Sequence, residues 1–263
     1  MNLNEYVNMW DKYFSEALES KNYIPSDCNL KKYYDSYDVL DGEYKKEVDY
    51  IPEPFLGDIN NAKVVIINTN PGGVAPFQKW QNGEIVNYIK NSIKNGSKSP
   101  YSDLAKNFIY INEDIDFNTE KTGKNFWKSR LNYINSVVEN DISKENIAAF
   151  EIYPWHSKRF KKEKLKNRDL ILKEFILEPI MDMDNVDYVF FLRSPIVEAM
   201  KDSGIKFDLI QHAWESKALK VFVANYKGKV FIGTINNQTG YPKIDGNDIK
   251  HLREIVKKYK ENK

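Results

Sequence analysis

The stretch VVIINTNPGG, residues 64–73, places four apolar residues directly before a polar turn. A short apolar run that ends at turn residues is typical of a strand buried on both faces. Pro71 fixes its own φ and biases Asn70 towards an extended backbone, so a stiff turn aims the Asn70 side chain. Gly72 and Gly73 allow unusual dihedral angles and let a ligand approach the backbone. The alternative is an ordinary strand-to-loop turn, in which the same residue types are common.

Further strands and helices are predicted on both sides of this stretch. Strands are expected over 63–69, 147–153, 186–192, 219–225 and 229–235, the last two joined at Lys227-Gly228. Helices are expected over 3–19, 125–138, 169–181, 196–202 and 248–259. Strands that alternate with helices predict an α/β fold with a mainly parallel sheet covered on both faces. One domain over 1–263 is expected, with an N-terminal helical extension (1–50) and an insertion (74–122) that resembles a lid more than core.

The composition is that of a globular protein. The chain has 263 residues, of which 41% are apolar and 14% aromatic, enough for a sizeable core. No apolar run approaches 18 residues, and the first residues lack the pattern of a signal peptide, so no membrane segment is expected. The single cysteine, Cys28, is consistent with a reducing compartment. These features predict a cytoplasmic protein.

Three polar loops follow predicted strands: NTNPGG (68–73), EIYPWHSKR (151–159) and TINNQTGYP (234–242). Ligands of open α/β sheets bind at the carboxyl ends of the strands, so these loops predict a site. Neither G-x-x-x-x-G-K-[ST] nor G-x-G-x-x-G is present, so the loops do not match the common phosphate-binding motifs. The three histidines are too scattered for metal-ligand spacing, and no metal or cofactor is expected.

The segment 157–168 is strongly basic, although the net charge of the chain is only +1. It contains seven Lys and Arg residues against a single acid, Glu163. Such a segment predicts a face that binds a polyanion. The alternative is a solvated surface with no partner.

Short motifs in three places resemble a known family. NTNPG resembles the G-I-N-P-G motif of the mismatch-specific branch of the uracil-DNA glycosylase superfamily, and KNFWK (124–128) resembles its N-R-F-W-K. TINNQT (234–239) occupies the position of its T-x-H-P-S-P or N-P-S motif, with Asn237-Gln238 in place of Pro-Ser. The resemblance covers about residues 52–258; the first 50 residues have no counterpart, and 74–122 is longer than the family connection. It implies a three-layer sandwich around a central, mainly parallel four-stranded sheet.

The resemblance also implies a function, namely hydrolysis of the N-glycosidic bond of a flipped-out base to leave an abasic site. Asn70 would position the attacking water, and Asn236 would donate to the departing base, although Asn236 is alternatively a turn residue. Phe126 would contribute to the binding of the substrate. The expected enzyme is monofunctional and uses no Schiff-base lysine.

Glu151 indicates which base is read. It follows the run IAAF, where uracil-reading members carry an asparagine, and an ionised glutamate only accepts hydrogen bonds. Cytosine presents an N4 donor that Glu accepts from, so cytosine is favoured over uracil. Gly72 and Gly73 stand where uracil-specific members exclude 5-substituents, which favours a bulky modified cytosine, such as glucosylated hydroxymethylcytosine in phage DNA. The resemblance to superfamily members that act in phage defence implies a role in anti-phage defence. The alternative for Glu151 is an ion pair with Lys158 or Arg159.

The expected partner is DNA, duplex or locally opened, and no obligate protein partner is expected. Predicted DNA contacts are His156, Lys158, Arg159, Lys161, Lys162 and Tyr241, the last as a wedge with Pro242. The main alternative function is a non-catalytic nucleic-acid-binding module of the same fold. An unrelated nucleotide or sugar-phosphate enzyme with an open α/β sheet is a third.

Overall fold

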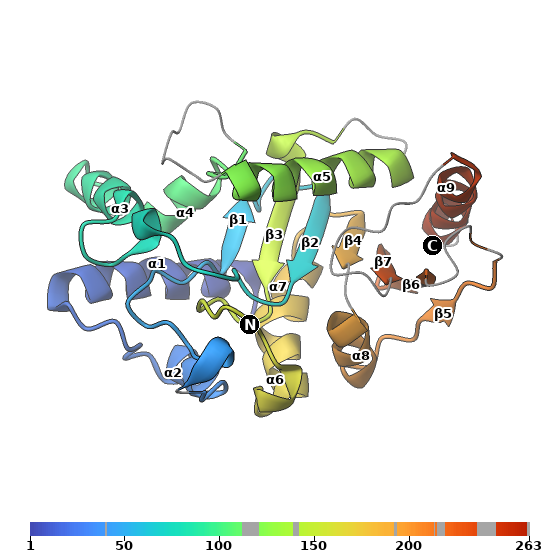
Figure 1. Ribbon diagram of the computed structural model, residues 1–263. Helices are drawn as coiled ribbons and strands as arrows, with labels where there is room; N and C mark the ends of the chain where they lie inside the picture. The colour runs from blue at the N-terminus through green and yellow to red at the C-terminus, as the bar shows by residue number, and fades with distance from the viewer. Residues whose placement is uncertain are drawn as a thin grey trace.

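The structure, a computed structural model, describes residues 1–39, 41–111, 121–138, 142–191, 194–212, 214, 219–235 and 246–261, with backbone alone at 121, 122, 162, 194 and 195. Within these residues a seven-stranded sheet has the order β1-β3-β2-β4-β7-β6-β5 (Figure 1). The strands are β1 (Phe55–Gly57), β2 (Val64–Asn68), β3 (Ile147–Glu151), β4 (Tyr188–Phe191), β5 (Asp208–Leu209), β6 (Lys220–Tyr226) and β7 (Lys229–Ile235). The α-helices are α1 (Leu3–Ser20), α2 (Cys28–Asp35), α3 (Glu84–Lys94), α4 (Pro100–Ala105), α5 (Lys121–Val137), α6 (Arg168–Leu172), α7 (Glu178–Met181), α8 (Ser194–Asp202) and α9 (Gly246–Glu261). The fold is therefore mixed α/β, as the sequence predicts.

Four strands form the parallel centre of the sheet. β2 pairs with β3 on one side and with β4 on the other, β4 pairs with β7, and all three pairs are parallel. The sequence predicts these four strands and their mainly parallel arrangement. The predicted size of four strands is wrong, because β1, β6 and β5 extend the sheet to seven among the described residues, each through an antiparallel pair. β1 has only three residues, too few to show the hydrophobic pattern from which a strand is predicted.

The hairpin between β6 and β7 follows from its two turn residues. Lys227 has φ 51° and Gly228 has φ 81°, the left-handed values that a two-residue type I′ turn requires. Tyr226 and Lys229 consequently face each other as the last pair of the ladder. The predicted turn at these two residues is confirmed.

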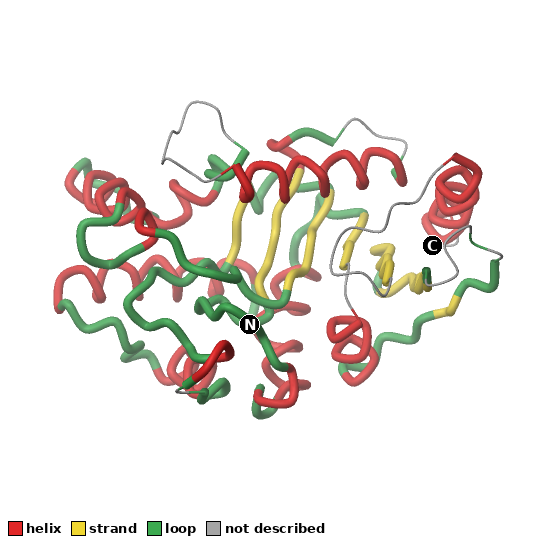
Figure 2. Tube along the Cα trace, in the orientation of Figure 1, coloured by secondary structure: helices red, strands yellow, loops and turns green. Residues whose placement is uncertain are grey.

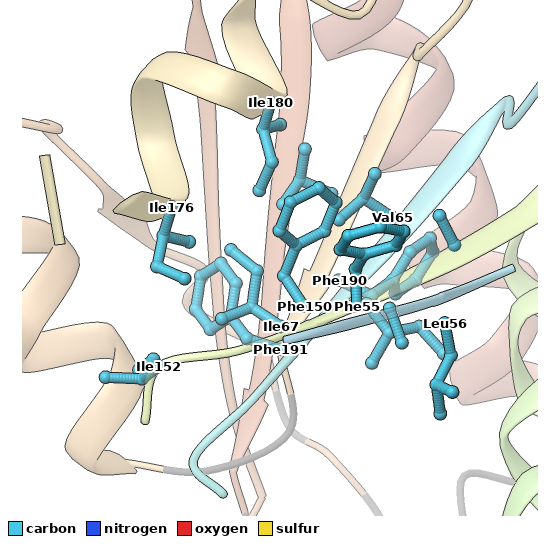
Figure 3. Close-up of a cluster of buried hydrophobic side chains, with 14 of the residues drawn as sticks. Phe55, Leu56, Val65, Ile67, Phe150, Ile152, Ile176, Ile180, Phe190 and Phe191 are labelled. Atoms are coloured by element: carbon cyan, nitrogen blue, oxygen red, sulfur yellow. The ribbon is translucent and has the colours of Figure 1, made fainter. Parts of the chain in front are cut away.

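The sheet buries both faces. Register places Ile67 between Phe150 of β3 and Phe191 of β4, and Figure 3 shows these side chains beside Ile176 and Ile180. On the opposite face, Phe190 meets the ring of Tyr133 from α5 edge-on at 6.1 Å. Figure 1 shows α5 across one side of the sheet, with α6, α7 and α8 on the other. Burial of such side chains contributes about 1.5–3 kcal/mol each.

The N-terminal extension packs into the same core. Asn2 and Glu5 form a capping box that starts α1. Tyr6, Trp10 and Phe14 on this helix are fully buried, and the ring of Trp10 lies 5.5 Å from that of Trp155. The helix α1 therefore helps to hold the loop that follows β3.

The described part of segment 74–122 also belongs to the core, so its description as a lid is wrong. The apolar face of α3 is buried through Ile85, Val86 and Ile89. The buried carboxylate of Asp11 accepts hydrogen bonds from the backbone N–H groups of Tyr101 (2.9 Å) and Ser102 (3.1 Å), which ties the first turn of α4 to α1.

The predicted helix over 169–181 is present but irregular. It runs as α6, a π-helical turn η5 (Lys173–Leu177) and α7. Pro179 has no N–H to donate to the preceding turn, which explains why the regular hydrogen-bond ladder is displaced just before it. Among the described residues, no helix combines the length and apolar character needed to cross a membrane.

Candidate functional site

The connections of the parallel strands create a crevice at the carboxyl ends of β2 and β4. The chain passes from β2 to β3 on one side, whereas β4 leads through β5 and β6 to β7 on the other. Ligands of open α/β sheets bind at such a reversal. Figure 2 shows loops gathered at the carboxyl ends of β2 and β3.

Asn70 joins the loop after β2 to the loop after β3. Its Nδ2 donates to the main-chain oxygen of Ser157 at 2.9 Å and to the Ser157 hydroxyl at 3.0 Å. Ser157 is fully buried and its hydroxyl donates to the main-chain oxygen of Arg159 at 2.9 Å. Since Nδ2 is committed to Ser157, Oδ1 points the other way, and among the described residues no donor contacts it. An acceptor oxygen on a fixed side chain is what the orientation of a water molecule requires.

One cavity, here called the acidic cavity, lies beside Asn70 and contains about 380 Å³ of space. Its walls include the aromatic rings of Phe77, Tyr110, Phe126 and Trp127. Its polar groups are those of Glu53, Asn70, Gln78 and Glu151. Apolar walls with a few convergent polar groups are typical of small-molecule sites, and this volume is in their usual range. The predicted residues Asn70, Gly73, Phe126 and Glu151 thus line one cavity.

Glu151 ends β3 inside this cavity and is buried. It pairs in register with Asn68 of β2, whose Nδ2 donates to Glu151 Oε1 at 3.0 Å. The two cations named as its alternative partners bind elsewhere: Lys158 lies 3.2 Å and Arg159 3.1 Å from carboxylate oxygens of Glu43. The Glu151 carboxylate is thus one of the polar groups that line the acidic cavity.

Glu53 is a second buried carboxylate of the cavity, and sequence reasoning did not find it. Its Oε1 accepts hydrogen bonds from Gln78 Nε2 and from the Tyr110 hydroxyl, both at 2.5 Å. Nε2 of His156 lies 3.5 Å from the same oxygen. Burial, with the adjacent Glu53 carboxylate, raises the pKa of Tyr110 well above its ordinary value, so this phenol stays a donor. The available signal was a lone acid between two prolines, IPEPF, next to apolar residues.

A second cavity, here called the basic crevice, lies at the β2–β4 boundary and contains about 500 Å³ of space. Residues 67–69 of β2 and its loop, with Ile196 of α8, place it there. Its cationic groups are those of Arg130, Lys158 and Arg159. The guanidinium carbon of Arg130 lies 3.2 Å from the centre of the Phe126 ring, which is 39% exposed. The crevice thus combines positive charge with a partly exposed aromatic ring.

The glycines of the loop leave room. Gly72 has φ +84°, a backbone that favours glycine, and a Cβ built on Gly72 or Gly73 would meet no atom within 4 Å. Gly73 lines the acidic cavity and Gly72 the basic crevice. Space is therefore open at both residues, and their role as the floor of a base pocket stays a prediction.

The predicted DNA contacts differ in their exposure to solvent. Lys158, Arg159 and Lys161 are exposed. His156 is fully buried, so its prediction as a DNA contact is wrong: its ring packs between Glu53 and the main-chain oxygen of Gly72 instead. Asn236, Tyr241 and the Lys162 side chain lie outside the described residues. Among the described residues, no three His, Cys, Asp or Glu side chains are grouped to hold a metal ion.

No protein-family model, curated protein or solved structure matches the chain. The resemblance of NTNPG, KNFWK and TINNQT to the uracil-DNA glycosylase superfamily therefore stays a prediction.

Proposed function

We propose that this chain is a monofunctional DNA glycosylase, which hydrolyses the N-glycosidic bond of a flipped-out base and leaves an abasic site. One observation carries the proposal: Asn70 and Pro71, together with Phe126, line both the acidic cavity and the basic crevice. A nucleotide connects its base to its phosphate through the sugar. Bound across this shared wall, it has its base in the acidic cavity, its phosphate in the basic crevice and its glycosidic bond beside Asn70.

The acidic cavity supports the binding of an extruded base. Aromatic rings of Phe126, Trp127 and Tyr110 offer surfaces for a planar ring. Glu151 supplies an acceptor in the cavity, suited to an exocyclic amine such as N4 of cytosine. The empty space at Gly73 suits a substituent on the 5-position. The proposed base is a bulky modified cytosine, for example glucosylated hydroxymethylcytosine of phage DNA.

The basic crevice and the exposed segment beside it support the binding of the DNA backbone. Lys158 and Arg159 project from the loop after β3, with side chains 73% and 63% exposed. Because both side chains are exposed, a DNA phosphate can replace Glu43 as the partner of these two cations. Lys161 is exposed on the same segment. Phosphate contacts of this kind fix the orientation of the duplex and leave base choice to the cavity.

The chemistry requires a water molecule below the sugar and stabilisation of the departing base. As the C1′–N bond lengthens, the sugar gains oxocarbenium character and the base gains negative charge. Asn70 Oδ1 is the acceptor proposed to hold the water, because Ser157 fixes the amide. Asn236 is proposed from the family resemblance as the donor to the base. We further propose that the fold is a variant of the uracil-DNA glycosylase sandwich and acts in the cytoplasm, in anti-phage defence.

The test is the formation of abasic sites on DNA that contains glucosylated hydroxymethylcytosine, compared with the same sequence containing plain cytosine or uracil. Cleavage at alkali-labile sites in the modified DNA alone is expected. DNA binding without any abasic site would favour the non-catalytic binding module. Efficient release of uracil alone would support the proposed glycosylase activity and contradict the proposed modified-cytosine substrate.

A further inference from the structure

We propose that Glu53 is the general base of the reaction, the group that takes a proton from the water held by Asn70. This inference rests on the proposed glycosylase function and adds to it. The side-chain amide of Asn70 can orient water, but it does not accept a proton under ordinary conditions. A second group is therefore needed for water to attack efficiently, and the acidic cavity contains a carboxylate that no loop motif indicates.

The backbone of Glu53 is unusually well fixed. Pro52 and Pro54 flank it, and each proline locks its own φ. The Glu53 N–H donates to the main-chain oxygen of Pro154 at 2.9 Å, which joins this residue to the loop after β3. The carboxylate is consequently held at the wall of the same cavity that Asn70 and Glu151 line.

The partners of Glu53 converge on one of its two oxygens. Gln78 and Tyr110 both donate to Oε1 at 2.5 Å. The orientation of Gln78 is set from the other side, since its Oε1 accepts from the Ala75 N–H at 2.8 Å, which turns Nε2 towards Glu53. Among the described residues, no donor contacts Glu53 Oε2. One oxygen is thus anchored, and the other is left for a ligand of the cavity.

His156 couples Glu53 to the loop that carries Asn70. Its Nε2 lies 3.5 Å from Glu53 Oε1, and its Nδ1 lies 3.4 Å from the main-chain oxygen of Gly72. The fully buried ring therefore spans from the carboxylate to the Asn-Pro-Gly turn. In this proposal His156 is a positioning residue, because its ring packs between the proposed base and the turn that carries Asn70.

Glu151 is less suited to this role. Its Oε1 accepts a hydrogen bond from Asn68, its register partner, at the end of β3. Its proposed partner is the polar edge of the base and not the sugar. The two carboxylates thus divide the work, Glu151 reading the base and Glu53 serving the water.

The proposed step balances without any further reactant. The water oxygen bonds to C1′, the C1′–N bond breaks, and its electron pair leaves with the base. The proton of the water passes to Glu53 Oε2. The protonated carboxyl then gives that proton to the departing base or to solvent and returns to its starting state.

The experiment measures single-turnover base release by Glu53→Gln and Glu53→Ala, with DNA affinity and melting temperature measured on the same preparations. General-base catalysis contributes about 10²- to 10⁴-fold, so both variants are expected to lose at least about 100-fold in rate. Added formate, a small carboxylate, is expected to restore part of the rate of Glu53→Ala and none of Glu53→Gln, whose amide fills the space. Glu84→Gln, an exposed glutamate at the start of α3, is the matched control.

Tyr110→Phe separates catalysis from packing. It removes one hydrogen bond to Glu53 and keeps the carboxylate, so a rate loss below about tenfold is expected, the cost of one weakened bond. A fully active Glu53→Gln overturns the inference. The inference is also overturned if formate does not restore the rate of Glu53→Ala and the melting temperature or DNA affinity of that variant falls together with its rate. If the wild-type protein releases no base from any DNA, the proposed function itself fails, and this role fails with it.

Discussion

Asn70 and Ser157 form two hydrogen bonds, from Asn70 Nδ2 to the main-chain oxygen of Ser157 at 2.9 Å and to its hydroxyl at 3.0 Å. These bonds cross from the loop after β2 to the loop after β3. They fix the amide in one orientation and leave Oδ1 for water. The proposed function depends on this orientation, because the shared wall of the acidic cavity and the basic crevice is built on it.

Glu151→Gln should change the choice of base. The substitution keeps the shape and replaces one acceptor oxygen by a donor, so a base with an N4 amine loses its partner. A specific base contact is worth about 1–3 kcal/mol, which predicts a reduction of about 5- to 150-fold on cytosine-type substrates. Uracil, with an oxygen at that position, should be accepted better than by the wild-type protein. Equal reductions on both bases, measured as single-turnover rates, would contradict the assignment of Glu151.

Gly73→Tyr should close the floor of the acidic cavity. The Cβ itself meets no atom within 4 Å, so the backbone should tolerate the change and the ring should occupy the space of a 5-substituent. A loss of about tenfold or more, or about 1.4 kcal/mol, is expected on the glucosylated base. Gly73→Ala is the control and should retain the wild-type preference. A Gly73→Tyr variant with undiminished activity on the bulky base would show that the substituent lies elsewhere.

The triple variant Lys158→Ala, Arg159→Ala and Lys161→Ala should weaken DNA binding at all sequences. For every phosphate that the variant no longer neutralises, the slope of log K against log salt should become shallower by about 0.9. The matched control changes Lys90 and Lys94 to Ala, two exposed lysines on α3 away from the crevice. Fluorescence anisotropy across a salt series measures both. An unchanged slope in the triple variant would indicate that the segment is a solvated surface that does not contact phosphates.

Lys46 gives a prediction about stability. Its Nζ donates to the main-chain oxygen of Tyr34 at 2.9 Å, and burial lowers its pKa to about 8 from the ordinary value of 10.5. Between these two values the unfolded chain binds more protons than the folded chain, so the free energy of unfolding should rise with pH across this window. Lys46→Met should remove about 1–2 kcal/mol of that rise, after allowance for solvent screening.

Urea unfolding across the same pH window measures this effect. Lys45→Met, at a half-exposed neighbour, is the control and should leave the rise intact. A wild-type protein whose unfolding free energy stays flat between the two pKa values would contradict the assignment of Lys46.

The sequence predicts the centre of the fold well because its signals are local. VVII (64–67), IAAF (147–150) and YVFF (188–191) are continuous apolar runs, and Lys227-Gly228 lies between two predicted strands at hairpin spacing. β1 was not predicted because three residues carry no period. The π-helical turn before Pro179 was not predicted because the apolar positions alone indicate a regular helix.

The sequence indicated candidate site residues only where they belong to a recognisable motif. Asn70 follows β2, Glu151 ends β3 and Phe126 belongs to the KNFWK motif of α5, and all three line the acidic cavity. Glu53 and His156 acquire their roles from residues distant in sequence: Gln78 is 25 positions and Tyr110 57 positions from Glu53, and Gly72 is 84 positions from His156. A basic neighbourhood suggested that His156 faces DNA, but its ring is fully buried between Glu53 and the main-chain oxygen of Gly72.

The most direct test of the central claim is single-turnover base release by Asn70→Ala on DNA containing the glucosylated base, with DNA affinity measured in parallel. Removal of a water-holding interaction of roughly 3 kcal/mol predicts a rate lower by about 100-fold. DNA affinity should stay within about twofold of wild type, because the phosphates are held by other residues. An Asn70→Ala variant that releases its base at the wild-type rate would contradict the account.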